Sequence, residues 1–523
     1  MKKNIPTWGI IAIIFIAAIF LQKNIYFNSD VQWLSIAASR LLAGGDYFPH
    51  FWETNPPLIL YIYILPVLMS QKFAISYSIT VRAELLLFIL FSLILSQQIL
   101  KKIFRAQQAN LLSGIVISLA LIYLIFPLHS FAQREHLILV LTMPYVFLIA
   151  GGCENIPYSK VLRIVVAASA AIGFAIKPYF LPTLLLLELY YSYRQQRWWA
   201  WLRLETVWIA IVFLAYGMSI IIFTPDYLTI ILPFIWHYYI PYYDYGKTSF
   251  LLLFANGFSF TVLAAFLFSY RLRNSGNRTL LVVLNITLLG FLIAYLWQKR
   301  AWYYHLLPMF SLAFLILINL VITTWQQWQQ EKTTNGKKLL IMFFLTVVLL
   351  FFPIKQVVSR MKDWLYQTNN NYSPWNQLAQ FINSHAAGKN MVVFSAHLGF
   401  IYTVAEHTKA HLLSPFEQYW MLPGIDALSQ QQRLSSVEKK QVAADKNIFV
   451  AAVVKEFIQQ QPALVLMDKD FNYIDLFSQS VAFRQAWRNY HLIPSPFALQ
   501  VYARSSERVN QCGKNFDQQN ECL

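Results

Sequence analysis

Long apolar segments recur along the first two thirds of this chain, and they constrain its fold more than any other feature. Eleven of them are long enough to cross a bilayer as helices. They lie near residues 7–22, 80–100, 109–127, 137–152, 161–176, 179–193, 204–223, 250–270, 279–297, 306–323 and 339–353. The chain is 57% hydrophobic and only 12% charged, more apolar than a soluble protein can accommodate. We therefore predict a polytopic α-helical membrane protein with about 11 transmembrane helices.

Basic residues set the predicted orientation. Clusters of Lys and Arg fall in alternate loops only if a shorter apolar segment, 57–70, does not cross fully; Pro66 interrupts it. The amino terminus is then cytoplasmic, segment 57–70 is a juxtamembrane or re-entrant helix, and residues 354–523 lie outside. The first apolar segment reads as an uncleaved span rather than a signal peptide. The net charge is +17, but the basic residues are scattered over short loops rather than gathered in one stripe, which argues against nucleic-acid binding.

The first outer loop, residues 23–79, is longer than a simple connection between spans requires. A helix should begin at Ser29 or Asp30, carry apolar residues at helical spacing and end at Gly44-Gly45. Such an amphipathic helix is expected to lie flat on the membrane surface. Asp30 is either the cap of this helix or a functional carboxylate. The polar, aromatic segment that follows supplies three candidate substrate-binding residues, which are His50, Glu53 and Asn55.

Cations in the outer loops break the positive-inside pattern. They are Arg134, Lys177, Lys247, Lys299 and Arg300. Pairing with a local carboxylate or a lipid head group would explain each one alone. Five together, beside aromatic residues, favour an anionic ligand such as a phosphate.

Two of these loops carry further polar groups. In the second outer loop, Arg134 and Glu135 are neighbours that point apart on a helix, so each should have another partner. After Lys299 and Arg300 come rings that suit a phosphate with a lipid or a sugar attached. The candidates there are Trp302, Tyr304 and His305.

Common soluble-enzyme motifs are absent from the sequence: it has no Gly-rich nucleotide loop, Walker motif, paired CxxC or HExxH. Three cysteines are too few for a disulfide framework. Cys512 and Cys522 are predicted outside, where they could form one bond, and Cys153 is predicted inside and free.

The order and sidedness of these motifs resemble the GT-C superfamily of polyprenyl-phosphate-sugar-dependent glycosyltransferases. Within it, the chain resembles the bacterial branch that holds protein O-mannosyltransferases and the lipid A aminoarabinose transferase. The resemblance covers roughly residues 1–320. It rests on Asp30 with the following SRLLAGGDYF, TNPPL at 54–58, QREH at 133–136, the pair Lys177-Pro178, and QKRAWYYHLLP at 298–308.

The resemblance implies an inverting transfer of a sugar from a polyprenyl phosphate to an acceptor hydroxyl, at the outer face of the bacterial inner membrane. Asp30 would act as the base and Glu135 as the acidic residue of the second outer loop. The donor phosphate would be bound by Arg134, His136, Lys177, Lys299 and Arg300. Many relatives have a second acid beside the first, whereas Val31 follows Asp30 here. A base and positive charge on the leaving phosphate are what the chemistry requires. A divalent metal is possible, and the sequence names no ligands for it.

After residue 353 the composition becomes that of a soluble domain. Segments 391–395 and 463–467 are typical of short buried strands, segments 375–385 and 451–460 of helices, and segment 490–504 of a last strand pair. We predict a transmembrane glycosyltransferase domain over 1–353, with juxtamembrane helices in its first outer loop, and a small periplasmic α/β domain over 354–523. That domain could cover the active site, select the acceptor or act as a stabilising cap.

A transporter or flippase of a lipid-linked saccharide is the main alternative. It predicts internal repeats and polar residues near the bilayer midplane. The sequence shows no repeat, and its ionisable groups collect at one face. A structural subunit of an envelope complex would leave the outer cations unexplained. The sugar stays open, as does the acceptor, which could be a protein, a lipid or a polysaccharide.

Overall fold

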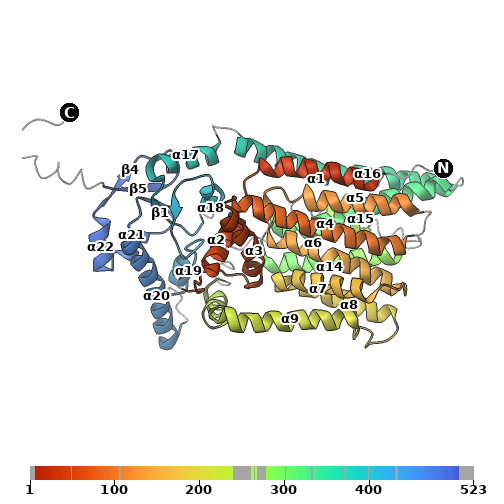
Figure 1. Ribbon diagram of the computed structural model, residues 1–523, viewed down its shortest axis with the longest axis horizontal. Helices are drawn as coiled ribbons and strands as arrows, with labels where there is room; N and C mark the ends of the chain where they lie inside the picture. Colours follow the sequence, from red (N-terminus) through yellow and green to blue (C-terminus); the bar gives the residue numbers. More distant parts are fainter. Residues whose placement is uncertain are drawn as a thin grey trace, which may run out of the picture. The chain divides into compact units, whose positions relative to one another are not determined.

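Most of the chain is described by a computed structural model (Figure 1). The contacts within it group the chain into two compact units. The described residues are 6–48, 50–104, 108–239, 261–263, 265–267, 278–300, 302–330, 334–369, 373–397, 400–429 and 434–505. Unit 1 comprises Met1–Val31, Asn55–Phe223 and Lys247–Asn369, and unit 2 comprises Gln32–Thr54, Thr224–Gly246 and Asn370–Leu523. Most of the expected span near 250–270 lies outside the described residues, as do Lys247, Cys512 and Cys522.

Unit 1 is a bundle of helices, and Figure 1 shows its long members running roughly side by side. They are α1 (Thr7–Lys23), α3 (Leu58–Phe73), α4 (Tyr77–Ile103), α5 (Ala109–Leu124), α6 (Arg134–Cys153), α7 (Lys160–Ile176), α8 (Leu181–Arg194), α9 (Leu204–Phe223), α14 (Arg278–Gln298), α15 (Tyr303–Gln330) and α16 (Thr334–Asn369). Two 3₁₀ turns, η2 (Leu128–Ser130) and η3 (Pro178–Phe180), join α5 to α6 and α7 to α8. Helix α6 packs against α4, α7, α14 and α15, and it forms the buried centre of the bundle.

The described helices support a membrane protein. Six of them are long and apolar enough to cross a bilayer, namely α4, α6, α9, α14, α15 and α16. Helices α7 and α8 qualify only together, as a pair bent by 119°, which makes up to seven. Helices α1, α3 and α5 are apolar but shorter. The expected number of about 11 spans is therefore not confirmed within the described part of the chain.

Unit 2 contains a five-stranded sheet in the order β2-β1-β3-β5-β4. Its strands are β1 (Asn390–Phe394), β2 (His411–Leu412), β3 (Leu464–Met467), β4 (Tyr490–Ile493) and β5 (Gln500–Arg504). Strands β2, β1 and β3 are parallel, with Met391 opposite Leu464, and β5 and β4 continue antiparallel, with Leu464 opposite Ala503. All four residues of β3 are buried, as expected for a strand covered on both faces.

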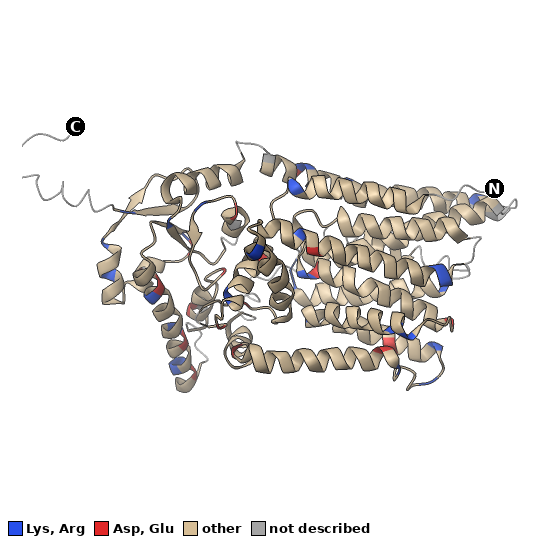
Figure 2. Cartoon of the chain, viewed as in Figure 1, with Lys and Arg blue, Asp and Glu red and all other residues tan. Residues whose placement is uncertain are grey.

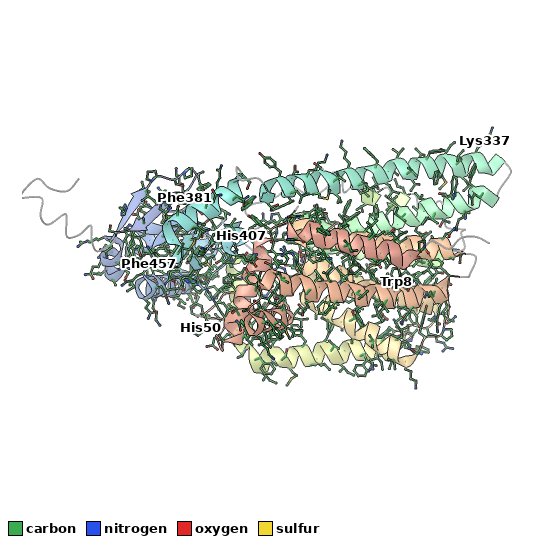
Figure 3. The ribbon with its side chains drawn as sticks, turned by 45° about the horizontal axis from the view of Figure 1, so that its top comes forward. Trp8, His50, Lys337, Phe381, His407 and Phe457 are labelled. Atoms are coloured by element: carbon green, nitrogen blue, oxygen red, sulfur yellow. The ribbon has the colours of Figure 1, made fainter. Side chains whose placement is uncertain are left out.

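Unit 2 also contains helices. They are α2 (Ser29–Leu42), which begins in unit 1, α10 (Leu232–Phe234) between the π-helices η4 (Tyr227–Ile231) and η5 (Ile235–Tyr239), α17 (Pro374–Ala386), α18 (Phe400–Ala405), α19 (Met421–Ser429), α20 (Ser436–Gln460), α21 (Tyr473–Phe477) and α22 (Val481–Trp487). The ring of Phe457 in α20, labelled in Figure 3, packs 6.1 Å from that of Phe394 in β1. Helix α20 begins well before the segment 451–460 predicted for it, because Ser435 and Glu438 form a capping box upstream.

The division into units differs from the expected boundary at residue 353. Helix α16 runs through this point, with Pro353 inside it, and ends at Asn369. Unit 2 also takes in Gln32–Thr54 and Thr224–Gly246, which are far from the sheet in sequence. Local composition cannot reveal such long-range packing.

The apolar face of α2 is covered by protein, which corrects the expectation that it faces lipid. Leu34 and Ala38 are fully buried. The ring of Trp33 packs edge-on against Tyr402 of α18, with 5.4 Å between the centroids. A helix whose apolar face is buried in this way is part of a folded core rather than a surface anchor.

Candidate active site

An ion pair joins the start of α2 to the start of α6. Arg134 Nη2 donates to Asp30 Oδ2 at 2.6 Å. The Arg134 side chain is 6% exposed and that of Asp30 is 20% exposed, so water screens this pair only partly. The sequence predicts that Arg134 has a partner other than Glu135, and this partner is Asp30.

Asn28, rather than Asp30, caps helix α2. The Asn28 side-chain oxygen accepts the backbone N–H of Asp30 at 2.9 Å and the amide of Gln133 at 2.8 Å. This leaves the Asp30 carboxylate available to Arg134. Reading Asp30 as the helix cap is thus wrong, and the signal was the asparagine two residues earlier.

A second charged cluster lies one residue further along α6. Lys177 Nζ donates to Glu135 Oε1 at 2.5 Å, and His305 Nε2 lies 3.5 Å from the same oxygen. The Lys177 and His305 nitrogens are 3.4 Å apart. Glu135 is fully buried, and its second oxygen has no hydrogen-bond partner among the described residues.

The chain reaches this cluster through a break between α7 and α8. Lys177 is extended, with φ −146° and ψ 108°, because the proline ring at 178 disfavours a helical residue before it. The chain is consequently bent by 119° between the two helices, and Lys177 lies at the bend. The Lys177-Pro178 pair in the sequence accounts for this geometry.

His305 is held by its other ring nitrogen. Nδ1 lies 3.3 Å from the carbonyl oxygen of Arg300 and donates to it, which leaves Nε2 as an acceptor toward Lys177. The rings of Trp302 and Tyr304 lie 5.3 and 4.4 Å from the His305 ring. The predicted aromatic group thus surrounds the predicted histidine.

The turn before α6 is fixed by two side chains. Ala132 adopts a left-handed φ of 69°. Its carbonyl accepts the Tyr63 hydroxyl at 2.9 Å, and its N–H donates to His136 Nδ1 at 3.3 Å. His136 Nε2 is then the protonated nitrogen, and the side chain is fully buried.

The other two predicted cations lie between the end of α14 and the start of α15. Lys299 is exposed and has a left-handed φ of 52°. The Arg300 guanidinium lies 5.8 Å from the Trp302 ring centroid, and Trp302 is 42% exposed.

Three predicted substrate-binding residues are divided between the units. Asn55 belongs to unit 1, whereas His50 and Glu53 belong to unit 2. Glu53 is buried, and its Oε2 accepts the Trp33 indole N–H at 2.8 Å. His50, labelled in Figure 3, is exposed and accepts the backbone N–H of Asp46 at 3.0 Å.

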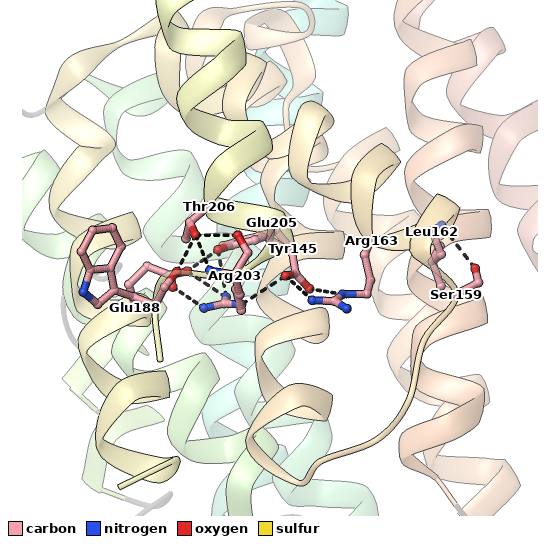
Figure 4. A network of polar contacts seen from close by, with 9 residues as sticks. Tyr145, Ser159, Leu162, Arg163, Glu188, Arg203, Glu205 and Thr206 are labelled. Atoms are coloured by element: carbon pink, nitrogen blue, oxygen red, sulfur yellow. Dashed lines mark hydrogen bonds and ion pairs between the residues drawn. The ribbon is translucent and has the colours of Figure 1, made fainter. Parts of the chain in front are cut away.

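The sequence did not reveal a second charged network in unit 1. Figure 4 shows it where α6, α7, α8 and α9 meet. Arg203 bonds Glu188 at 2.5 and 3.0 Å and Glu205 at 3.3 Å. Arg163 bonds Glu205 through two nitrogens, at 2.7 and 2.8 Å, and Tyr145 donates to Glu188.

Charged residues are sparse along the bundle and gather near the ends of its helices (Figure 2). In the candidate site the carboxylates of Asp30 and Glu135 meet the cations of Arg134 and Lys177, so their charges cancel. Among the described residues no group of three or more His, Cys, Asp or Glu is placed to hold a metal ion. The arrangement offers a carboxylate base beside two cations, which suits transfer from a phosphate.

Comparison with known proteins gives matches to solved structures and to neither family models nor curated sequences. No protein-family model matches the sequence, and no curated protein matches it. The fold is similar to ArnT from Cupriavidus metallidurans bound to undecaprenyl phosphate, with a TM-score of 0.53 and 12% identity, over 94% of this chain and 97% of that one. For ArnT in the apo state the TM-score is 0.51 and the identity 10%, over 95% of this chain and 98% of that one.

This similarity extends over nearly the whole of both chains. At the level of the fold, the chain is therefore similar to ArnT.

Proposed function

We propose that this chain is a membrane glycosyltransferase that moves a sugar from a polyprenyl phosphate to an acceptor hydroxyl. The observation that carries the proposal is the partly buried Asp30–Arg134 pair beside the Glu135–Lys177–His305 cluster, in a chain whose fold is similar to that of ArnT. The ArnT structure with undecaprenyl phosphate supports a lipid-phosphate donor. We place the site on the outer face of the bacterial inner membrane, following the charge pattern of the loops.

In the proposed mechanism the donor phosphate binds Arg134 and displaces the Asp30 carboxylate from it. The freed carboxylate accepts the proton of the acceptor hydroxyl while the hydroxyl oxygen attacks the anomeric carbon. The bond from that carbon to the phosphate oxygen breaks, and its electron pair stays on the phosphate. The products are the glycosylated acceptor and the polyprenyl phosphate, and the anomeric centre is inverted.

Lys177, His136, Lys299 and Arg300 are proposed to share the charge of the phosphate. The Nε2–H of His136, in the buried first turn of α6, is a donor that can serve an anion. Glu135 holds Lys177 at 2.5 Å and thereby orients its ammonium group. Positive charge placed in advance stabilises the leaving phosphate without reorganisation during the reaction.

Transfer of radiolabelled sugar tests this proposal. Membranes carrying wild type or Asp30→Asn receive a crude pool of polyprenyl-phosphate sugars, with and without a chelator, which tests the divalent metal. We expect label in a protein, lipid or polysaccharide fraction with wild type only, and that fraction identifies the acceptor class. Asp46→Asn is the matched control, because it removes an exposed carboxylate of the same loop.

Two outcomes contradict the proposal. Equal transfer by wild type and Asp30→Asn would exclude Asp30 as the base. No transfer by wild type with several donors, together with movement of a lipid-linked saccharide across vesicles, would favour the transporter.

A further inference from the structure

The segment that joins α8 to α9 exposes aromatic rings together with cations. Its Tyr and Trp side chains are between 42% and 76% exposed, although folded proteins cover most of such rings on average. Two exposed arginines lie among them. We call this set the α8–α9 surface, and it consists of Tyr193, Arg194, Arg197, Trp198, Trp199 and Trp201.

The protein does not neutralise the two arginines of this surface. Within the described part of the chain, the side chains of Arg194 and Arg197 form neither an ion pair nor a hydrogen bond. The next arginine, Arg203, is instead bonded to Glu188 and Glu205 in the network of Figure 4. The α8–α9 surface therefore carries two positive charges that can bind an anion from outside the protein.

Backbone hydrogen bonds order the segment that carries these side chains. The Arg197 N–H donates to the Ser192 carbonyl at 3.2 Å, and the Leu202 N–H donates to the Trp199 carbonyl at 2.9 Å. The Arg203 N–H donates to the Trp201 carbonyl at 2.9 Å, and the Arg203 side chain is fixed by the buried network. The exposure of the rings is therefore a property of the folded segment and does not result from fraying.

Apolar side chains lead to this surface from both helices. Leu185 and Leu189 on α8 are exposed one turn apart, and Tyr193 continues the row at the same spacing. Val207 and Ile211 are likewise exposed in the first turns of α9, which is a candidate membrane span with 6% of its apolar window buried. An apolar wall that ends in Trp, Tyr and Arg is typical of the boundary between acyl chains and head groups.

We infer that the α8–α9 surface binds an anionic phospholipid, with Arg194 and Arg197 on the lipid phosphate and the tryptophan rings at the base of the head groups. Arginine donates paired hydrogen bonds to phosphate oxygens. A zwitterionic lipid carries its own cation beside the phosphate and so neutralises these arginines less well. The 14 residues of α8, about 21 Å along the helix, separate this surface from Lys177 of the candidate active site.

Quenching of tryptophan fluorescence by brominated lipids tests this inference. Purified full-length protein is reconstituted in phosphatidylcholine nanodiscs with a rising fraction of brominated phosphatidylglycerol or of brominated phosphatidylcholine. The quenching that is lost in Trp198→Phe/Trp199→Phe comes from the α8–α9 surface. Two cations at a membrane surface favour anionic lipid by about thirtyfold at low salt. We therefore expect half-maximal quenching at a correspondingly lower fraction of the anionic lipid.

Matched variants assign this preference to the two arginines. Arg194→Gln/Arg197→Gln keeps both tryptophan probes and should give the same quenching curve with either brominated lipid. Lys101→Gln/Lys102→Gln removes two cations from the end of α4 and should retain the wild-type preference. All of these residues are exposed, so the variants should fold as wild type does.

Three outcomes would overturn the inference. They are equal quenching of the wild-type surface by the two lipids, a preference that Arg194→Gln/Arg197→Gln retains, and a surface that neither lipid quenches. The measurement involves no sugar transfer, so its result is independent of the proposed function.

Discussion

Arg134 Nη2 lies 2.6 Å from Asp30 Oδ2, whereas the next residue, Glu135, pairs with Lys177. Adjacent helical residues point apart, so the first turn of α6 distributes one cation and one carboxylate to different partners. In the proposed mechanism, the phosphate and the Asp30 carboxylate compete for the same guanidinium. Phosphate binding and release of the base are then one event.

This competition predicts that Asp30→Asn binds the bare lipid phosphate more tightly than wild type while losing transfer activity. A neutral amide no longer competes for Arg134, and a partly exposed ion pair contributes up to about 1 kcal/mol, which corresponds to roughly fivefold in affinity. Titration of undecaprenyl phosphate into purified Asp30→Asn measures the change. Asp46→Asn serves as the control with unchanged affinity. Weaker binding by Asp30→Asn would show that Asp30 and the phosphate do not compete.

A second prediction concerns the buried Glu135–Lys177 pair. Lys177→Met leaves the fully buried Glu135 without its cation, so we expect a loss of about 3–5 kcal/mol in the free energy of unfolding. Adding Glu135→Leu removes the unpaired carboxylate and should restore most of that stability. Denaturation in mixed micelles measures both variants.

Sugar transfer distinguishes a functional from a purely structural role of the Glu135–Lys177 pair. The double variant should fold but remain deficient in sugar transfer, because Lys177 is proposed to bind the phosphate. A stable double variant with wild-type transfer would assign the pair a purely structural role.

Local rules predicted several features of the fold in both units. The break at Lys177 follows from Pro178, and the end of α2 follows from Gly44, which adopts a left-handed φ of 83°. The different partners of Arg134 and Glu135 follow from helical geometry alone. These features depend on residues close together in the sequence.

Features that depend on distant residues could not be predicted in this way. Sequence alone could not assign Glu53 to the Trp33 indole, because that choice depends on how α2 and the following loop fold within unit 2. Likewise, only the meeting of four helices brings Arg163 and Arg203 to Glu188 and Glu205. Long-range packing decides these contacts.

A third prediction is that acid destabilises the protein through His129. Burial, and secondly the charge of Arg360, lower the pKa of His129 to about 3, and its ring stacks on Trp364 at 4.0 Å. The unfolded chain binds a proton below about 6.5, but the folded chain does not until about 3, so the free energy of unfolding falls as the pH drops between these values. From pH 7.5 to pH 5 we expect a loss of about 2 kcal/mol from this group.

The test is the pH dependence of unfolding in detergent. His129→Phe keeps a ring against Trp364 and should remove this part of the dependence. His385→Phe, at an exposed histidine of unit 2, is the control and should retain it. An identical pH profile for His129→Phe and wild type would contradict the prediction.

The network in Figure 4 leads to the last prediction, which separates stability from catalysis. Arg203 is 10% exposed and bonds both Glu188 and Glu205. Arg203→Ala removes this cation from two buried carboxylates, so we expect a loss of about 3–5 kcal/mol in the free energy of unfolding. Arg163 is 30% exposed, and its loss leaves Glu205 still paired with Arg203, so Arg163→Ala should cost only about 1 kcal/mol.

Transfer per folded molecule should stay at the wild-type level in both variants. Tyr145 reaches this network eleven residues after Arg134 on α6, which corresponds to about 16 Å along the helix. Unfolding curves and transfer rates, with exposed Arg197→Ala as the control, measure the two properties separately. A fall in transfer rate for Arg163→Ala without a matching loss of stability would instead show that the network positions Lys177 through α7.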